Sequence, residues 1–166
     1  VLMNCLNGAR YLTDAIASVQ AQTYRDWELI FWDDDSTDDS WARATQAAQT
    51  DPRIRCFLGE GGQSLGMSRR LATNLARGAY LAILDCDDLW YSDKLARQVA
   101  FMDAHPSVAF TFSDCDFIDA EGAPRGLAFV RTPPPANEAM YQVLYRGLLT
   151  SPNFMLCPTL LFRTED

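Results

Sequence analysis

Two short apolar runs, each ending abruptly in aspartates, constrain the fold of this 166-residue chain more than any other feature. Residues 27–32 lead into the acidic segment 33–35, and residues 80–84 lead into the acid-rich segment 85–88. Short apolar runs bounded by polar residues are typical of buried strands. Because ligands of open α/β sheets bind outside the carboxyl ends of the strands, we expect both acidic segments at one crevice.

Helical patterns alternate with the expected strands. Leu12, Ile16 and Val19, for example, have the spacing of one helix face. Strands are expected at residues 1–5, 27–32, 54–58, 80–84 and 108–112. A first helix is expected after residue 8. A second should start at a hydroxyl cap, Ser36, Thr37 or Ser40, and stop before Asp51-Pro52. Further helices are expected at 65–76, 92–104 and 137–146. The alternation predicts an α/β fold with a mostly parallel central sheet flanked by helices.

Length and composition suit a single domain over residues 1–166. A chain of this length with 48% hydrophobic residues can bury one substantial core. Val1 begins as though already inside a strand, and residues 162–166 stop without a closing element. We therefore expect a domain that is truncated at both ends.

Charge and cysteine content exclude several classes of protein. The net charge of -8, from 22 acidic and 14 basic residues, has the wrong sign for binding nucleic acid. No apolar run approaches the roughly 18 residues of a membrane span, so none is expected in this segment. Five cysteines without a C-x-x-C pair indicate reduced side chains rather than a disulfide framework. The single histidine, His105, is expected to be structural.

The aspartates suit a divalent cation. Carboxylate oxygens are the ligands that Mg²⁺ and Mn²⁺ prefer, and phosphates and waters commonly complete the shell. Asp85 and Asp87, one residue apart, can both reach one ion from a turn. Four acids in two clusters would repel one another without a cation or a hydrogen-bonding ligand. Helix capping, in contrast, accounts for Asp38, Asp39 and Asp93.

The other polar groups leave alternatives open. The carboxylates of residues 33–35 can accept a nucleobase proton or ribose hydroxyls, and spacing alone does not assign the task. Arg69 and Arg70 suit either a diphosphate or a solvated helix face. The glycine-rich segment 59–62 matches no phosphate-binding pattern and is expected to be a loop.

Several motifs together resemble the family 2 glycosyltransferases, which are inverting enzymes of the GT-A fold. The resemblance is strong over residues 1–119, and any one motif alone is weak. The motifs are Asn7-Gly8-Ala9-Arg10-Tyr11-Leu12, the segment 15–24, Asp26-Trp27-Glu28-Leu29-Ile30, the segment 33–38, Ala76-Arg77-Gly78-Ala79-Tyr80, Leu84-Asp85-Cys86-Asp87-Asp88 and Lys94-Leu95. The resemblance implies that 1–119 form the nucleotide-sugar-binding part and that 120–166 begin an incomplete acceptor-binding part.

The resemblance also implies residue roles. Asp34 would contact the base, most often uracil, with Asn4 and Leu6 lining the pocket. Asp87 would hold the Mg²⁺ or Mn²⁺ ion that bridges the diphosphate. The full set of implied nucleotide-sugar-binding residues is Asn4, Leu6, Asp34, Arg69 and Asp85. Three residues depart from the usual pattern: Leu6 replaces an aromatic ring, Asp35 replaces glycine in an Asp-Gly-Ser turn, and Arg70 stands where asparagine is common.

The catalytic base is not among these residues. Inverting members use a carboxylate that follows the strand resembling residues 158–163, so the base is expected beyond residue 166, with Asp114 as a weaker candidate. Glu165 and Asp166 stand too close to that strand for the role. The resemblance implies sugar transfer from a nucleotide-diphosphate sugar, expected to be a UDP-sugar, to the hydroxyl of a saccharide, lipid-linked or protein acceptor. The expected setting is cell-envelope polysaccharide synthesis in the cytoplasm, including the inner face of the membrane.

Three alternatives stay open at this stage. A phosphoacceptor receiver domain also gathers acids around Mg²⁺, although its acidic pair follows the first strand and here a strand and a helix precede Asp33. A sugar nucleotidyltransferase usually has a glycine-rich, basic loop after the first strand, which residues 7–10 match poorly. The chain would bind the donor without turnover if its missing tail carries the base.

Overall fold

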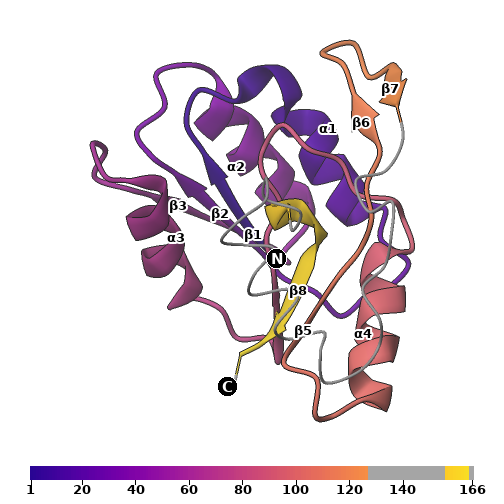
Figure 1. The fold of residues 1–166 in the computed structure, drawn as a ribbon. Helices are drawn as coiled ribbons and strands as arrows, with labels where there is room; N and C mark the ends of the chain where they lie inside the picture. The colour runs from indigo at the N-terminus through magenta and orange to yellow at the C-terminus, as the bar shows by residue number, and fades with distance from the viewer. Residues whose placement is uncertain (127–155, 165–166) are drawn as a thin grey trace.

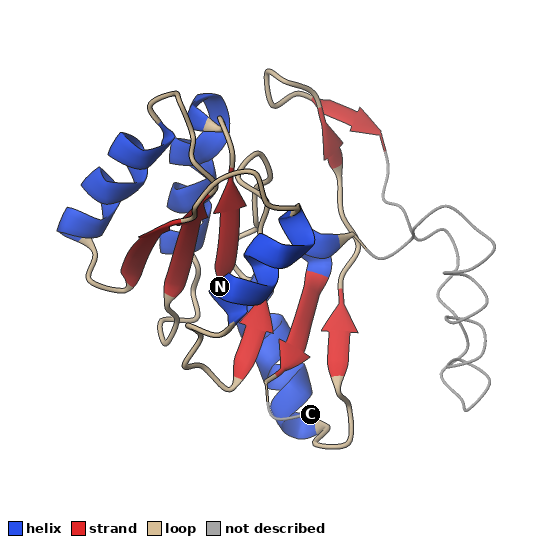
Figure 2. Cartoon of the chain, turned by 90° about the vertical axis from the view of Figure 1, so that its left-hand side faces the viewer, coloured by secondary structure: helices blue, strands red, loops and turns tan. Residues whose placement is uncertain are grey.

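A computed structural model describes residues 1–126 and 156–164 (Figures 1 and 2). The elements are, in chain order, β1 (Leu2–Cys5), α1 (Ala9–Gln20), β2 (Leu29–Asp33), α2 (Ser40–Thr50), β3 (Ile54–Leu58), α3 (Leu65–Thr73), β4 (Tyr80–Ala82), α4 (Lys94–Ala104), β5 (Phe110–Phe112), β6 (Phe117–Ile118), β7 (Pro124–Gly126), a 3-10 turn (Cys157–Thr159) and β8 (Leu160–Arg163). The helix expected at 137–146 lies outside the described residues.

The central sheet is mixed, with its strands in the order β3-β2-β1-β4-β8-β5. β1, β2 and β3 pair in parallel, as the alternating pattern predicts. β8 runs antiparallel between β4 and β5. A parallel bridge between Leu2 and Ile83, and a 3.0 Å hydrogen bond from Leu84 N to Leu2 O, join the two halves at β1 and β4. The α/β expectation is therefore confirmed, and the sheet is parallel in its first half only.

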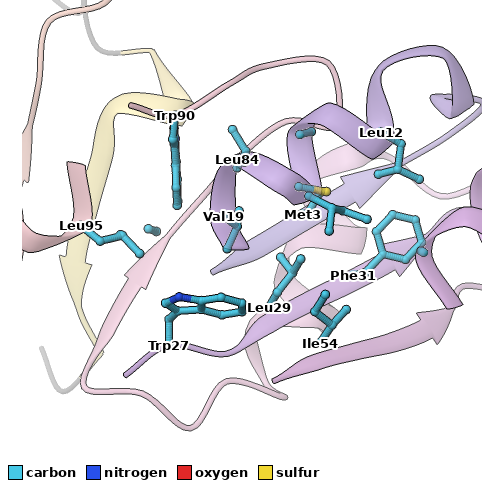
Figure 3. Close-up of a cluster of buried hydrophobic side chains, with 14 of the residues drawn as sticks. Met3, Leu12, Val19, Trp27, Leu29, Phe31, Ile54, Leu84, Trp90 and Leu95 are labelled. Carbon is cyan, nitrogen blue, oxygen red and sulfur yellow. The ribbon is translucent and has the colours of Figure 1, made fainter. Parts of the chain in front are cut away.

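Helices cover both faces of the first half of the sheet. One face carries α1, whose Leu12 and Val19 pack in the core cluster with Met3 and Phe31 (Figure 3). The opposite face carries α3, whose Ala72 packs on neighbouring strand residues in a second, smaller cluster. Strands covered on both faces must be apolar along their whole length. This requirement explains the continuous apolar runs that end in aspartates.

Two helix boundaries differ from the sequence pattern, and polar contacts explain the first of them. α3 ends at Thr73 rather than near residue 76. Past that point, Leu75 O accepts a 3.0 Å hydrogen bond from the Arg55 guanidinium, and Arg77 N donates to the Glu28 carboxylate at 2.6 Å. The Arg55 and Glu28 side chains therefore hydrogen-bond to the Leu75 carbonyl and the Arg77 amide, which would bond within the helix if α3 continued for another turn. α4 begins at Lys94, two residues later than expected.

The start of α2 also differs from expectation. Asp39 is the residue before the first turn, and no hydroxyl caps the helix. Ser40 Oγ instead accepts a hydrogen bond from Gly8 N at 3.0 Å and donates to Asp38 Oδ1 at 2.5 Å. Asp38 Oδ2 accepts from Ala9 N at 2.9 Å. Ser40 and Asp38 therefore tie the loop after β1 to the start of α2.

We expect Asp35→Gly to raise the free energy of unfolding by about 1 kcal/mol, because Asp35 has a left-handed backbone with φ of 69°. The substitution also removes one of several neighbouring negative charges. Urea unfolding of both proteins measures the difference. Asn7→Gly is the matched control, since Asn7 has φ of 55° but its Oδ1 accepts from Thr37 N at 2.8 Å. Asn7→Gly should lose stability, because it removes that hydrogen bond. A loss of stability in Asp35→Gly would contradict the prediction.

Candidate functional site

The direction of the chain across the sheet changes at β1 and β4. β2 and β3 lie on one side of β1, whereas β8 and β5 lie beyond β4. Crossover loops leave such neighbouring strands in opposite directions, and a crevice opens outside their carboxyl ends. The segment after β1 and the acid-rich segment 85–88 after β4 lie at this point. The topology therefore brings the acid-rich segment beside Asn4, Cys5 and Leu6.

α3 connects the two acidic clusters through adjacent side chains. Ser68, which is fully buried, donates a 2.6 Å hydrogen bond to Asp34 Oδ1. Arg69 forms an ion pair with Asp85 of the acid-rich segment. One residue of α3 thus holds the acid after β2 and the next holds the acid after β4. The expectation that the two clusters share one site is consistent with this geometry.

One carboxylate oxygen of Asp34 accepts two hydrogen bonds from neighbouring side chains. Its Oδ1 accepts from the Trp32 indole Nε1 at 3.0 Å and from Ser68, while its backbone N donates to Cys5 O at 2.9 Å. Oδ2 takes no part in these contacts. Two elements, β2 and α3, fix the side chain and β1 fixes the backbone, with one carboxylate oxygen left to accept a hydrogen bond from a ligand.

Buried polar atoms without partners occur at the carboxyl ends of two strands and on α3. Within residues 1–126 and 156–164, such atoms occur on Asn4 (Nδ2 and Oδ1), Asp33 (Oδ2), Arg69 (Nε) and Trp27 (Nε1). Asn4 and Asp33 lie at the carboxyl ends of β1 and β2, where alternation along the strands puts their side chains on opposite faces of the sheet. Asn4 shares the face that α3 covers, and α3 carries Arg69. Buried polar groups in folded proteins are almost always hydrogen-bonded. A ligand with its own donors and acceptors on this face would satisfy the Asn4 and Arg69 atoms.

The acid-rich segment concentrates negative charge. It turns back on itself through a 3.1 Å hydrogen bond from Asp88 N to Asp85 O, and it leaves Asp87 exposed. Burial raises the pKa of Asp88 to about 6, and the charges of Asp87 and Asp85 add to the shift. A cation bound here would relieve this repulsion.

The described residues can bind a divalent cation only if a ligand completes the coordination shell of the cation. Among them, no group of three or more histidine, cysteine, aspartate or glutamate side chains is arranged to hold a metal. Mg²⁺ is commonly bound by one or two carboxylates plus substrate phosphates and waters. Asp87, exposed and next to Asp88, suits such a partial site.

Two cysteines at the site had no signal in the sequence. Cys5 ends β1 and Cys86 lies between Asp85 and Asp87. Their side chains meet beside Gly8, where a methyl group would lie 2.6 Å from Cys86 Sγ and 2.8 Å from Cys5 Sγ. The hydrogen bond with Cys86 lowers the pKa of the Cys5 thiol to about 7. Ser68 and Trp32 are the other site residues that sequence patterns did not indicate.

The remaining predicted residues have simpler surroundings. Leu6 is 60% exposed at the rim of the crevice, in keeping with a base-contacting position. Asp114 follows β5, and its Oδ1 accepts from Cys115 N at 2.9 Å, a contact typical of a turn. Residues 59–62 form a loop, as expected. Glu165 and Asp166 lie outside the described residues. In the described ranges, no helix has the length and apolar character that crossing a membrane requires.

We expect Gly59→Ala to loosen Asp34. An added Cβ would lie 2.7 Å from Trp32 Nε1 and 3.1 Å from Asp34 Oδ1, so it would displace the hydrogen bond between them. Thermal unfolding should show a loss of about 1–2 kcal/mol. Gly66→Ala is the control, because that glycine lies in α3 with nothing within 4 Å of the added methyl. The control should gain stability from helix propensity, and equal effects of the two substitutions would contradict the prediction.

Comparisons with known proteins identify the family and the fold of this chain. The E. coli UDP-Glc:alpha-D-GlcNAc-diphosphoundecaprenol beta-1,3-glucosyltransferase WfgD is 30% identical over 119 residues, which cover 72% of this chain and 46% of that protein. The crystal structure of S. aureus TarS in complex with UDP matches with a TM-score of 0.73 at 23% identity, covering 98% of this chain and 46% of that one.

A third similar protein is the mannosyltransferase PcManGT from Pyrobaculum calidifontis in complex with GDP-Man and Mn²⁺, with a TM-score of 0.61, 24% identity and coverage of 66% and 33%. The chain thus spans less than half the length of each of these three proteins. The structural likenesses show the GT-A fold. The family model described as Glycosyl transferase family 2 matches residues 1–162. On this match, the chain belongs to glycosyltransferase family 2.

Proposed function

We propose that this chain binds the nucleotide-diphosphate sugar of an inverting, metal-dependent glycosyltransferase, with UDP as the nucleotide. The observation that carries the proposal is the link that α3 makes between the two acidic clusters, with unpartnered buried atoms on Asn4 and Arg69 on the same face of the sheet. Residues 1–119 form the donor-binding part, and 120–166 begin the acceptor-binding part. WfgD, with UDP-Glc in its name, and the UDP complex of TarS support the choice of nucleotide.

The base binds between β1 and β2. Asp34 Oδ2 accepts the imide proton of uracil, because Oδ1 is already occupied by Trp32 and Ser68. Asn4 supplies one donor and one acceptor that have no protein partner. Leu6 packs against the base with an exposed aliphatic side chain in place of an aromatic ring. Hydrogen bonding by Asp34 and Asn4 therefore contributes more to base recognition than stacking does.

The diphosphate binds near the acid-rich segment. Asp87 holds a divalent ion, Mn²⁺ or Mg²⁺, which neutralises charge on the departing diphosphate when bound. The Mn²⁺ complex of PcManGT supports the use of such an ion. Asp85 lies near the sugar and ribose. Arg69, now paired with Asp85, has one unpartnered buried nitrogen and is placed to stabilise negative charge on the phosphates.

Transfer requires a base that this chain does not supply among its described donor-site residues. In the proposed reaction a carboxylate takes the proton of the acceptor hydroxyl, whose oxygen attacks the anomeric carbon from the face opposite the diphosphate. We place this base beyond residue 166, with Asp114 as the weaker candidate. The acceptor is a saccharide, lipid-linked sugar or protein at the cytoplasmic face of the membrane. WfgD, named for a diphosphoundecaprenol-linked acceptor, makes the lipid-linked class the first to test.

Calorimetric titration of the folded chain with UDP, GDP and TDP tests the donor site. With Mn²⁺ present, UDP should bind most tightly, and EDTA should weaken its binding. Tighter binding of GDP or TDP would overturn the choice of base. No binding of any of the three, in protein that circular dichroism shows to be folded, would overturn the donor-site proposal. Binding is the appropriate measurement because a chain that lacks the base would bind the donor without turnover.

A further inference from the structure

Cys5 and Cys86 lie on neighbouring segments. The parallel bridge between Leu2 and Ile83 sets the register of β1 against the strand that leads into the acid-rich segment. Beyond this bridge the second segment leaves the strand, and Cys86 lies in the turn that the hydrogen bond from Asp88 N to Asp85 O closes. This turn places the Cys86 side chain against Cys5 at the end of β1.

The two thiols also approach one another through space. Both sulfurs lie within 2.8 Å of the point where a methyl group on Gly8 would stand. Gly8 has no side chain to separate them, and its backbone is fixed by the hydrogen bond from its N to Ser40 Oγ. Cys5 is 2% exposed, whereas Cys86 is partly exposed and accessible to a small oxidant.

We propose that Cys5 and Cys86 form a reversible disulfide, made by a peroxide and broken by thiols, that ties the end of β1 to the acid-rich segment and weakens donor binding. The effect on binding rests on the function proposed above, because Cys86 lies between Asp85 and Asp87. Closing the bond draws the Cys86 sulfur toward the sheet and turns the peptide units that carry both carboxylates. Disulfides in cytoplasmic proteins are usually transient or redox-sensing, which suits this position.

The chemistry needs one peroxide for each disulfide. One of the two sulfurs attacks the peroxide, the O–O bond breaks, and that cysteine becomes a sulfenic acid while one water leaves. The other sulfur then attacks the sulfenic acid sulfur, so that the S–S bond forms and the S–O bond breaks. The hydroxyl group departs as a second water with the proton of the second thiol. Two thiols are oxidised and the peroxide is reduced to two waters.

Peptide mapping of the full chain tests the bond directly. After hydrogen peroxide and alkylation of free thiols, trypsin should release Val1–Arg10 joined to Gly78–Lys94. The joined peptide should be lighter than its two parts by two hydrogen atoms and should separate on reduction. Cys5→Ser and Cys86→Ser should each abolish it, while Cys56→Ser, in β3, should retain it. Separately alkylated Cys5 and Cys86 peptides, or a crosslink to another cysteine, would overturn the proposed disulfide.

A second measurement tests the effect on the donor site. UDP affinity with Mn²⁺ should fall about tenfold or more on oxidation, recover with dithiothreitol and stay constant in Cys86→Ser, since displacing groups that orient a metal ligand commonly costs 10–100-fold. A crosslink with unchanged affinity would overturn the switch. If the reduced protein binds no nucleotide diphosphate, the proposed function fails, while peptide mapping still decides whether the disulfide forms.

Discussion

Asp87→Asn should lower the affinity for UDP in the presence of Mn²⁺ by about 100-fold, equivalent to about 2.8 kcal/mol. The substitution keeps the size of the side chain and removes the charge that would bind the ion. In EDTA, the variant and the unsubstituted protein should bind UDP equally. Calorimetry in the two conditions gives both comparisons from the same protein preparation.

Stability distinguishes loss of the ion from loss of the fold. Asp87 is exposed and adds to the electrostatic repulsion that raises the pKa of Asp88, so its neutralisation should leave thermal stability unchanged or slightly higher. Asp39→Asn is the control, since Asp39 is also exposed and its side chain makes no capping hydrogen bond at α2. UDP affinity that still depends on Mn²⁺ in Asp87→Asn would show that another residue holds the ion.

The positions of the two acidic segments at the ends of strands were predictable because they depend on short-range features. Apolar runs covered by helices on both faces must end where the sheet ends, and the aspartates mark those ends. The pattern therefore identified the segments 33–35 and 85–88 without any long-range information. The structure confirms the strands and the α/β class, while the residue roles within the site stay predictions.

The contacts that complete the site were not predictable from the sequence. Ser68 lies 34 residues from Asp34, and a serine in a helix gives no indication of its partner. Cys5 and Cys86 meet only because β4 adds to the sheet beside β1. The insertion of β8 between β4 and β5 likewise depends on pairing between segments far apart in the sequence, such as Tyr80 with Arg163 and Phe110 with Phe162, for which an apolar run carries no signal.

The ion pair of Arg69 with Asp85 links these features to donor binding. In the protein without ligand, the pair neutralises one acid of the acid-rich segment and holds α3 against the crevice. In the proposed complex the diphosphate would pair with Arg69 and hydroxyls of the sugar and ribose would donate to Asp85, so the pair could open with both side chains still in polar contact. Donor binding would thus replace an internal ion pair with two contacts to the ligand, and neither charged side chain would be left buried without a partner.

Lys94→Met should stabilise the protein at pH 6 by about 1–3 kcal/mol, because a buried charge is replaced by a side chain of similar shape. Lys94 is 8% exposed, and its Nζ lies 4.2 Å from the centre of the Trp90 ring and donates to Gln98 Oε1 at 2.6 Å. Burial lowers the pKa of this amine to about 7. No carboxylate forms an ion pair with it among the salt bridges of the described residues.

The sign of the pH dependence follows from that lowered pKa. Between about pH 7 and the ordinary lysine value near 10.4, the unfolded chain binds more protons at Lys94 than the folded chain. The contribution of Lys94 to the free energy of unfolding is therefore greatest above the ordinary lysine pKa, and it is lost as the pH falls to about 7. Lys94→Met removes this term, so its advantage at pH 6 should disappear by pH 10, where the neutral amine still donates to Gln98.

Urea unfolding of both proteins from pH 6 to pH 10 measures the difference in their free energies of unfolding. Both proteins contain the same cysteines, so the effect of cysteine titration cancels in this difference. Arg97→Met is the control in the same helix, because its guanidinium is largely exposed and pairs with Asp93 at the surface. The control should change stability little at any of these pH values, since exposed ion pairs contribute little. A difference between Lys94→Met and the unsubstituted protein that stays constant from pH 6 to pH 10 would show that the buried amine keeps its charge throughout, stabilised by Trp90 and Gln98.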